Sequence, residues 1–428
     1  MTIRVTERRK SGAVSIDGLG TISGSVLGDW STVSTDVACY EVPNISRFAY
    51  VSDVLSLGDP WSAVVPDPQG RYRDKLRPGA FVELYLANPN VSGGQNTRKV
   101  TGRITRRRLD VSEAGSVVNL EGADLGVHLR SNVPIWKSLR GRSWKFLAEN
   151  CLDPSWGFTE VRLGNDLNQR LNNGRAEKVI QLRPTLALDP FARIETTPGQ
   201  TVADLLITYA RRKSLMVNVS SDGYLQTFAP DYSTKPLYKL RYFDWSDPRS
   251  VENNVERLSL DEDEGPLYTD VLCVAESVYT PKDFATAQAS GGNAAAVAGQ
   301  GGQTHQGDVH AGKFPRAYVD RTLLPYVKRK TFSDGEMYSP ADAYTRAFHA
   351  FNRGRFDAWT LRATVRGHWN QQDWWEAGLM CDVEIDTPQL SYKGNLYVKR
   401  VECTRTDQGD LAQLELKLPD LLYEVGTR

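Results

Sequence analysis

The sequence predicts a mainly β protein with a mixed α/β insert between two β-rich regions. Residues 1–130 and about 246–428 hold short segments rich in Val, Ile and Thr, with Gly, Pro and Asn clusters between them. Between these regions, from 131 to about 245, apolar residues recur at helical spacing. At 428 residues the chain is too long for one core, and roughly 150 residues per domain predicts two to four domains. We therefore expect β domains at 1–130 and 246–428 on either side of an α/β domain at 131–245.

The first region is predicted from alternating segments such as "FVELYLA" at 81–87. Alternation places Val82, Leu84 and Leu86 on one face of a strand, because successive side chains point to opposite sides. We expect that face to lie in a core.

The insert begins with "GRSWKFLAENCLDPSWGF", which has helical spacing until Pro154. In "TTPGQTVADLLITYARRKSL", at 196–215, Thr201 is a candidate N-cap and Asp204 lies in the first turn, where a carboxylate is favoured. The predicted buried stripe of this helix is Val202, Leu205, Leu206 and Tyr209. A hairpin with strands at 216–219 and 224–228 should follow, turning at "SSDG".

The last region contains a segment at 286–313 that is almost entirely small or polar, which we expect to be a flexible excursion. "SPADAYTRAFHAFNRGRF" follows as a helix with Pro340 in its first turn. Its predicted buried residues are Tyr344, Ala347, Phe348 and Phe351. In the last strand, Leu414, Leu416 and Leu418 should face the core, with Gln413, Glu415 and Lys417 solvated or against a neighbouring subunit.

Composition predicts a protein that folds in the cytoplasm of its host. The 52 basic and 52 acidic residues cancel, which gives no overall attraction to nucleic acid or to anionic membranes. No apolar run reaches about 18 residues, and the N-terminus lacks a secretory signal, so we expect no stable membrane insertion. Five dispersed cysteines without a C-x-x-C pair predict buried free thiols.

Candidate catalytic and metal-binding residues are few. No phosphate-binding, dinucleotide-binding or nucleophile-elbow motif occurs in a strand–loop–helix context. His305 and His310 would lack rigid support as metal ligands. Glu149 with Asp153, and the acidic run 261–264, are candidates for paired carboxylates, but a solvated loop explains the run better. The sequence therefore predicts no enzyme and no catalytic, metal-binding or cofactor-binding residue.

The basic cluster Arg106, Arg107 and Arg108 lies on a predicted strand. Its side chains alternate between two faces and cannot form one continuous basic patch. Nucleic-acid binding, a channel wall and a subunit interface could all use these residues.

The stretch 196–215 resembles the opening of a LysM peptidoglycan-binding module, in which a Pro-Gly turn leads into an amphipathic helix. This resemblance implies a peptidoglycan-binding or peptidoglycan-degrading tail protein as the alternative function. A structural role within the insert is the competing interpretation. Binding to purified sacculi would distinguish them.

The arrangement as a whole resembles the baseplate hub proteins of contractile-tailed phages, the Mu-like hub or prophage tail P-like family. "KVTGRITRRRLDVSEAGSVVNLEGADLGVHL" matches the family's strand pair and its Gly-x-Asp-Leu, here Gly122, Asp124 and Leu125. "RIETTPGQTVADLLITYARRKSLMVNVSSDGYL" matches its central helix and hairpin. "AFHAFNRGRFDAWTLRATVRGHW" ends in its Gly-x-Trp, Gly367 and Trp369, and "LYVKRVECTRTDQGDLAQLELKLPD" matches its closing hairpin.

This resemblance implies two tail-tube-like β-barrel domains in each chain and a homotrimeric ring in the baseplate of the virion tail. Six barrels from three chains would mimic a hexameric tube layer. The implied partners are a trimeric central spike, the tail tube or a tube-initiator protein, and neighbouring baseplate proteins. DNA would only pass through the channel during genome ejection. No catalysis and no cofactor are implied.

Overall fold

The structure is a computed structural model that describes residues 2–8, 37–87, 96–133, 139–163, 188–276, 313–334 and 340–421, apart from single positions and pairs within these ranges. The predicted flexible excursion at 286–313 lies outside them except for its last residue. The chain forms two compact units, one of Met1–Leu258 with Arg362–Leu416 and one of Ser259–Leu361 with Lys417–Arg428. The predicted boundaries at 130/131 and 245/246 stay a prediction. Among the described helices, none is long and apolar enough to cross a membrane.

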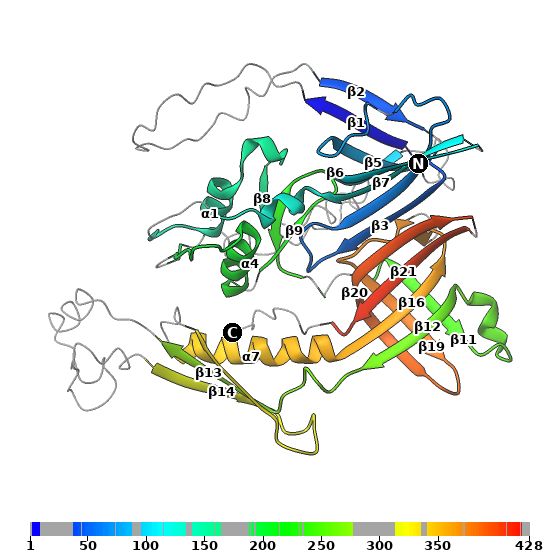
Figure 1. Ribbon diagram of the computed structural model, residues 1–428. Helices are drawn as coiled ribbons and strands as arrows, with labels where there is room; N and C mark the ends of the chain where they lie inside the picture. Colours follow the sequence, from blue (N-terminus) through cyan, green and yellow to red (C-terminus); the bar gives the residue numbers. More distant parts are fainter. Residues whose placement is uncertain are drawn as a thin grey trace, which may run out of the picture. The chain divides into compact units, whose positions relative to one another are not determined.

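A sheet of thirteen strands dominates the described residues, which confirms the predicted mainly β fold (Figure 1). Its path is β12-β16-β21-β20-β3-β4-β7-β6-β5-β1-β2, and β19 joins it through β20 and carries β11. The strands are β1 (Thr2–Arg8), β2 (Val37–Val42), β3 (Arg47–Asp53), β4 (Pro60–Pro66), β5 (Phe81–Ala87), β6 (Asn96–Ser112), β7 (Gly115–Asp124), β11 (Tyr238–Phe243), β12 (Val255–Glu262), β16 (Trp359–Arg366), β19 (Met380–Asp386), β20 (Ser391–Thr406) and β21 (Gly409–Lys417).

The alternation predicted for 81–87 is confirmed on β5, where Val82, Leu84 and Leu86 are all buried. Neighbouring β1 buries Ile3 and Val5 and pairs antiparallel with both β2 and β5. These apolar faces keep the register of the strands, because a slip by one residue would turn them toward solvent.

The long strand β20 joins the two β-rich regions. Its first half, Ser391 to Tyr397, pairs with β19, and its second half, Phe48↔Arg405 to Asp53↔Arg400, pairs with β3. Strands from the two ends of the chain therefore share one sheet, a connection that no local pattern in the sequence predicts.

The strands β12, β16, β21, β20, β19 and β11 pair in this order (Figure 1). Two asparagines before β12 link its start back to β11. Asn253 accepts from the Phe243 N–H at 2.7 Å and donates to the Phe243 carbonyl at 2.9 Å. Asn254 accepts from the Arg241 N–H at 2.9 Å and donates to the Lys239 carbonyl at 2.8 Å. These amide side chains replace ladder bonds between β11 and the start of β12, and they close the ring of strands at this end.

Replacing Asn253 by alanine should lower the free energy of unfolding by about 1–2 kcal/mol, because both backbone groups of Phe243 lose their partner. Asn150→Ala, at an exposed amide that donates only to the Phe146 carbonyl, is the control and should change the free energy of unfolding by no more than about 0.5 kcal/mol. Hydrogen exchange of the Phe243 amide reports the effect directly. Unchanged protection in Asn253→Ala would contradict this account of ring closure.

An α/β part with its own buried core lies in the region predicted as the insert. Its elements there are the 3₁₀ helix η3 (Pro154–Trp156), the helices α1 (Trp144–Cys151) and α4 (Val202–Arg212), and the sheet of β8 (Val161–Leu163), β10 (Leu225–Phe228) and β9 (Met216–Val219). The 3₁₀ helix η2 (Leu125–Arg130), just before position 131, buries Leu125 and Leu129 in the same core. Thr201 caps α4 as predicted, accepting from the Asp204 N–H at 3.1 Å. The predicted stripe of α4 is buried, and Trp144 Nε1 donates to the Leu206 carbonyl at 3.0 Å, which fixes α1 to α4.

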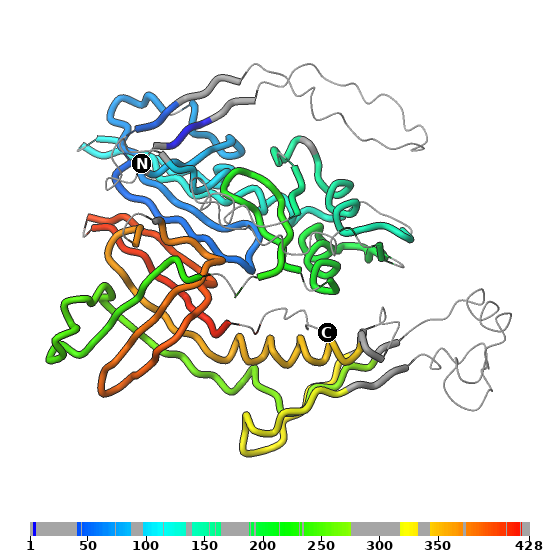
Figure 2. The backbone as a smooth tube through the Cα atoms, turned by 180° about the vertical axis from the view of Figure 1, so that it is seen from behind, coloured from blue at the N-terminus to red at the C-terminus, as the bar shows by residue number. Residues whose placement is uncertain are grey.

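The second compact unit contains a three-stranded sheet covered by one helix (Figure 2). In this sheet β13 (Asp270–Glu276) lies between β14 (Lys313–Val319) and β15 (Arg329–Asp334). Helix α7 (Pro340–Ala358) packs Ala343, Ala347 and Phe351 against Val271 and Cys273. A short hairpin, β17 (Trp369–Asn370) with β18 (Asp373–Trp374), and η4 (Pro248–Glu252) belong to the first unit.

Two predicted burial assignments were wrong in this part of the chain. Tyr344 is 42% exposed, because the buried stripe of α7 follows the i, i+4, i+8 row of Ala343, Ala347 and Phe351. Lys417 was placed on a solvated face, yet it is 3% exposed. Its Nζ donates to Thr360 Oγ1 at 2.6 Å and lies 5.2 Å from the centre of the Phe356 ring. This hydrogen bond offsets part of the cost of burying an ammonium group.

Candidate functional site

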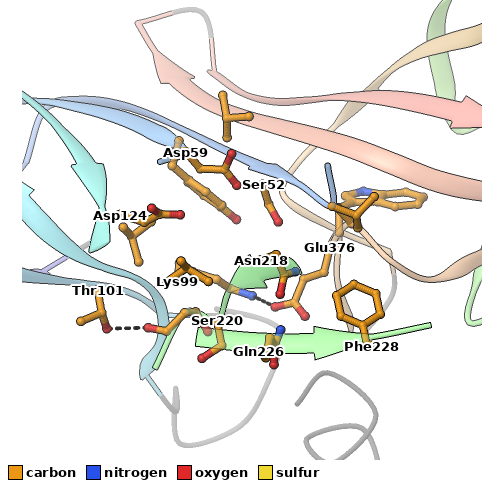
Figure 3. A pocket seen from close by; sticks show the side chains of 18 residues that line it. Ser52, Asp59, Lys99, Thr101, Asp124, Asn218, Ser220, Gln226, Phe228 and Glu376 are labelled. Carbon is orange, nitrogen blue, oxygen red and sulfur yellow. Dashed lines mark hydrogen bonds and ion pairs between the residues drawn. The ribbon is translucent and has the colours of Figure 1, made fainter. Parts of the chain in front are cut away.

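A cavity of about 70 Å³, lined by both polar and apolar side chains, lies inside the first unit, where three regions of the chain meet (Figure 3). Strand β6 contributes Lys99 to Thr101, and the β9–β10 hairpin contributes residues 218–221, 226 and 228. The segment before β19 contributes Trp375 to Ala377, and residues of β3 and the β3–β4 loop complete the wall. The first β region, the insert and the last β region therefore all supply residues to one cavity.

An ion pair crosses this cavity from β6 to the segment before β19. The Lys99 side chain is only 3% exposed, and its Nζ bonds Glu376 Oε1. The same Nζ lies 4.6 Å from the centre of the Trp374 ring, a cation–π distance. Removing one partner of such a buried pair leaves the other charge uncompensated, which makes the pair a strong constraint on how the segments meet.

A buried carboxyl pair, Asp59 and Asp124, forms another wall of the cavity (Figure 3). Asp124 Oδ1 accepts from the Gly126 N–H at 2.7 Å and so caps η2, while the Asp124 N–H donates to the Asp59 carbonyl at 3.0 Å. Asp59 Oδ2 accepts from the Asp53 N–H at 2.9 Å, but Asp59 Oδ1 has no hydrogen-bond partner among the described residues.

Burial raises the pKa of Asp124 to about 7 against backbone hydrogen bonds that lower it. Burial raises the pKa of Asp59 to about 8, and the charge of Asp124 adds to the increase. Two buried carboxyls side by side resist double ionisation, so the pair retains a proton near neutral pH.

The arrangement is suited to holding the first β region, the insert and the last β region together. At roughly 10–15 Å³ per water, the cavity has room for a few water molecules. Water there would satisfy groups such as Asp59 Oδ1 and Asn218 Oδ1, both buried without a partner in the described part of the chain. Thr101 Oγ1 donates to the Ser221 carbonyl at 2.5 Å and ties the hairpin turn to β6. The sequence analysis did not identify Asp59 or Lys99 as buried residues. Nothing in the sequence around either residue indicates that its charged side chain is buried.

The predicted candidate acidic residues have local structural partners. Glu149 pairs with Lys145 at 3.6 Å, and Asp153 caps η3 by accepting from the Ser155 N–H at 2.7 Å. The acidic run 261–264 is exposed at the end of β12. His305 and His310 lie outside the described residues, within which no group of three potential metal ligands occurs.

The LysM-like stretch at 196–215 forms the capped turn and helix α4. The apolar face of α4 is used in the core of the insert, beside α1 and the sheet of β8, β9 and β10. Burial in that core accounts for the helical pattern of this stretch. Peptidoglycan binding stays a prediction.

The motif residues quoted for the hub resemblance have local structural roles. A Cβ at Gly122 would lie 2.2 Å from the Trp61 ring, so only glycine fits beneath that side chain. Gly367 has a φ of 76°, in the left-handed region that favours glycine, and Trp369 packs edge-on to Trp374 with ring centres 5.3 Å apart.

No protein-family model matches the chain, and no curated protein matches it. The fold is similar to that of the tail protein from Neisseria meningitidis MC58, with a TM-score of 0.65 and 21% identity over 90% of this chain and 95% of that one. It is also similar to the 43 kDa tail protein of prophage MuSo2 from Shewanella oneidensis, with a TM-score of 0.63 and 12% identity over 99% of this chain and 100% of that one. The chain therefore has the fold of these two tail proteins.

Proposed function

We propose that the chain is a structural component of a phage tail, the hub of a contractile-tail baseplate in the Mu-like hub or prophage tail P-like family. The observation that carries this proposal is the fold similarity to two tail proteins over at least 90% of each chain compared. The motifs quoted from the sequence support it independently, since they lie in the same order along the chain. The role is one of geometry, and it needs no catalysis and no cofactor.

In this proposal three chains form a ring that adapts the sixfold tail tube to the threefold central spike. Each chain contributes two tube-like β domains, at 1–130 and 246–428, so three chains present six. Strands β1–β7 supply the first. Strands β12, β16 and β19–β21 supply the second, and β11 (Tyr238–Phe243), at the end of the insert region, joins it through β19. Their joining through β3 and β20 supports the proposal, because one continuous sheet would hold the two domains of a chain in fixed positions in the ring.

The cavity supports the same role. The buried pair Lys99–Glu376 links residues 277 apart in the chain, and such a link restrains the β regions and the insert against one another. A baseplate hub transmits force between the tube and the spike, so rigid joints between its parts serve that function. Tube, spike and neighbouring baseplate proteins are the proposed partners, in the tail of the virion.

The purified chain should have a mass in solution near three times 47.8 kDa, because a cyclic ring of heterologous contacts closes at three copies. Multi-angle light scattering at micromolar concentration measures this mass, and dilution tests its stability. A monomer that persists at those concentrations would contradict the ring.

A further inference from the structure

Residues 105–112 of β6 form an unusual strand edge. Strand β5 pairs with β6 only between Asn96 and Arg103, and Ile104 makes the next backbone bonds, to Gly79 and Ala80. From Arg106 to Ser112 the described strand neighbour of β6 is β7 alone. Among the described residues, no strand pairs with this edge of the hairpin beyond Ile104, although the Arg107 side chain donates to the Leu76 carbonyl at 3.2 Å.

The side chains along this edge combine charge with exposed apolar surface. Arg106 and Arg108 are 70% and 72% exposed, and charged residues are a usual protection of a strand edge. Leu109 and Val111 point to the same face and are 42% and 80% exposed, which protection does not explain. Exposed apolar residues in alternation are typical of one half of a strand pair.

A complementary edge occurs on the later part of β12, beyond the start that Asn253 and Asn254 tie to β11. β12 ends the path of the large sheet, and its described strand partner is β16. Leu258 and Leu260 alternate along it and are only half-buried, while Asp261, Glu262 and Asp263 are exposed. From 255 to 264 the sequence "VERLSLDEDE" holds five acidic residues and one arginine. This strand therefore has the opposite charge to the arginines of β6 and the same apolar spacing.

We propose that the β6 edge of one copy pairs antiparallel with β12 of a second copy of this chain, with Leu109 opposite Leu260. This inference rests on the proposed homotrimer and names its subunit contact. The register brings together two apolar pairs and three pairs of opposite charge: Leu109–Leu260, Val111–Leu258, Arg106–Asp263, Arg107–Glu262 and Arg108–Asp261.

The register is specific. A shift by one residue places Leu109 opposite either Ser259 or Asp261, and both apolar pairs are lost. Directly opposed apolar and oppositely charged pairs each stabilise an antiparallel ladder, and like charges destabilise it. Because the two edges differ, the contact is head-to-tail and can close into a ring, whereas a twofold dimer would bury one edge against itself.

Single cysteine variants test the register directly. A mixture of Leu109→Cys and Leu260→Cys proteins, oxidised briefly, should yield a disulfide-linked dimer, because opposed residues bring their Cβ atoms within reach of a disulfide. The double variant should yield linked dimers and trimers. Leu109→Cys mixed with Lys393→Cys is the matched control, with a cysteine at an exposed site of β20, and should stay uncrosslinked, as should the unsubstituted protein.

Charge reversal is the second arm. Arg106→Glu with Arg108→Glu should weaken self-association about tenfold or more, since two opposite-charge pairs become like-charge pairs. Asp261→Arg with Asp263→Arg should do the same. Mixing the two reversed proteins should restore two of the three contacts of a ring, and combining all four reversals in one chain should restore all three, a result that misfolding cannot produce.

The outcomes separate this contact from the hub proposal. The protein could have the mass of a trimer but show no Leu109–Leu260 crosslink and no recovery of association when the reversed proteins are mixed. This result would overturn the contact and would leave the trimeric ring unaffected. A monomeric protein would overturn both. Crosslinking at the predicted pair with rescue would support both.

Discussion

Replacing Asp59 by asparagine is expected to stabilise the protein by about 2 kcal/mol at pH 8 and to flatten the pH dependence of its stability. Folding raises the pKa of Asp59 to about 8 and that of Asp124 to about 7, chiefly through burial. A carboxyl whose pKa is raised by folding stabilises the folded state most below its unfolded pKa, and this contribution is lost as the pH rises through the folded pKa. The unsubstituted protein should therefore lose stability between about pH 4 and 8.

Asparagine has nearly the same shape and cannot ionise, so its side chain can keep the hydrogen bond from the Asp53 N–H without the cost of a buried charge. Urea unfolding at pH 5.5 and pH 8, followed by tryptophan fluorescence, measures the two free energies. Asp74→Asn, at a carboxylate that is 80% exposed, is the control and should change the slope little. A loss of stability at pH 8 in Asp59→Asn would show that the buried pair does not hold a proton.

The second large effect is expected for Gly122→Ala, which should destabilise the protein by about 3 kcal/mol through overpacking. An added Cβ would lie 2.2 Å from the Trp61 ring and 2.4 Å from the Arg103 carbonyl. Trp61 is buried and the carbonyl belongs to the β6 backbone, so neither can move away easily. Thermal unfolding followed by near-UV circular dichroism would measure the loss.

Gly394→Ala is the matched control, because its Cβ would meet only the end of the Tyr392 side chain, at 3.3 Å. Its effect should stay within about 0.5 kcal/mol. Replacing Trp61 by leucine should make room for an added Cβ at position 122. The double variant Trp61→Leu with Gly122→Ala should therefore lose less free energy of unfolding than the sum of the losses of the two single variants. Equal stability of Gly122→Ala and the unsubstituted protein would contradict the close packing.

The proposals for function and for the subunit contact depend on different observations. The hub proposal depends on fold similarity over nearly the whole chain, together with the order of the sequence motifs. The subunit contact depends on two strand edges whose exposed side chains complement each other in one register. For this reason the crosslinking experiment can fail without affecting the mass measurement.

The sequence by itself determined the local elements of this protein. The alternation in β5, the Thr201 cap of α4 and the buried stripe of that helix were predicted correctly, because each depends on residues within a few positions of one another. The mainly β class followed from the same short-range patterns. Burial of four cysteines as free thiols was also predicted, since an isolated thiol behaves as a small apolar group.

Only the tertiary structure decided which distant parts meet. The pairing of β3 with β20, the ion pair of Lys99 with Glu376 and the carboxyl pair of Asp59 and Asp124 join segments with no local sign of their partners. Many amphipathic strands in this chain could satisfy the same alternation, so the choice depends on the whole arrangement. Lys417 shows the consequence, because a charged residue at an apparently solvated position is buried once Thr360 and Phe356 are placed beside it.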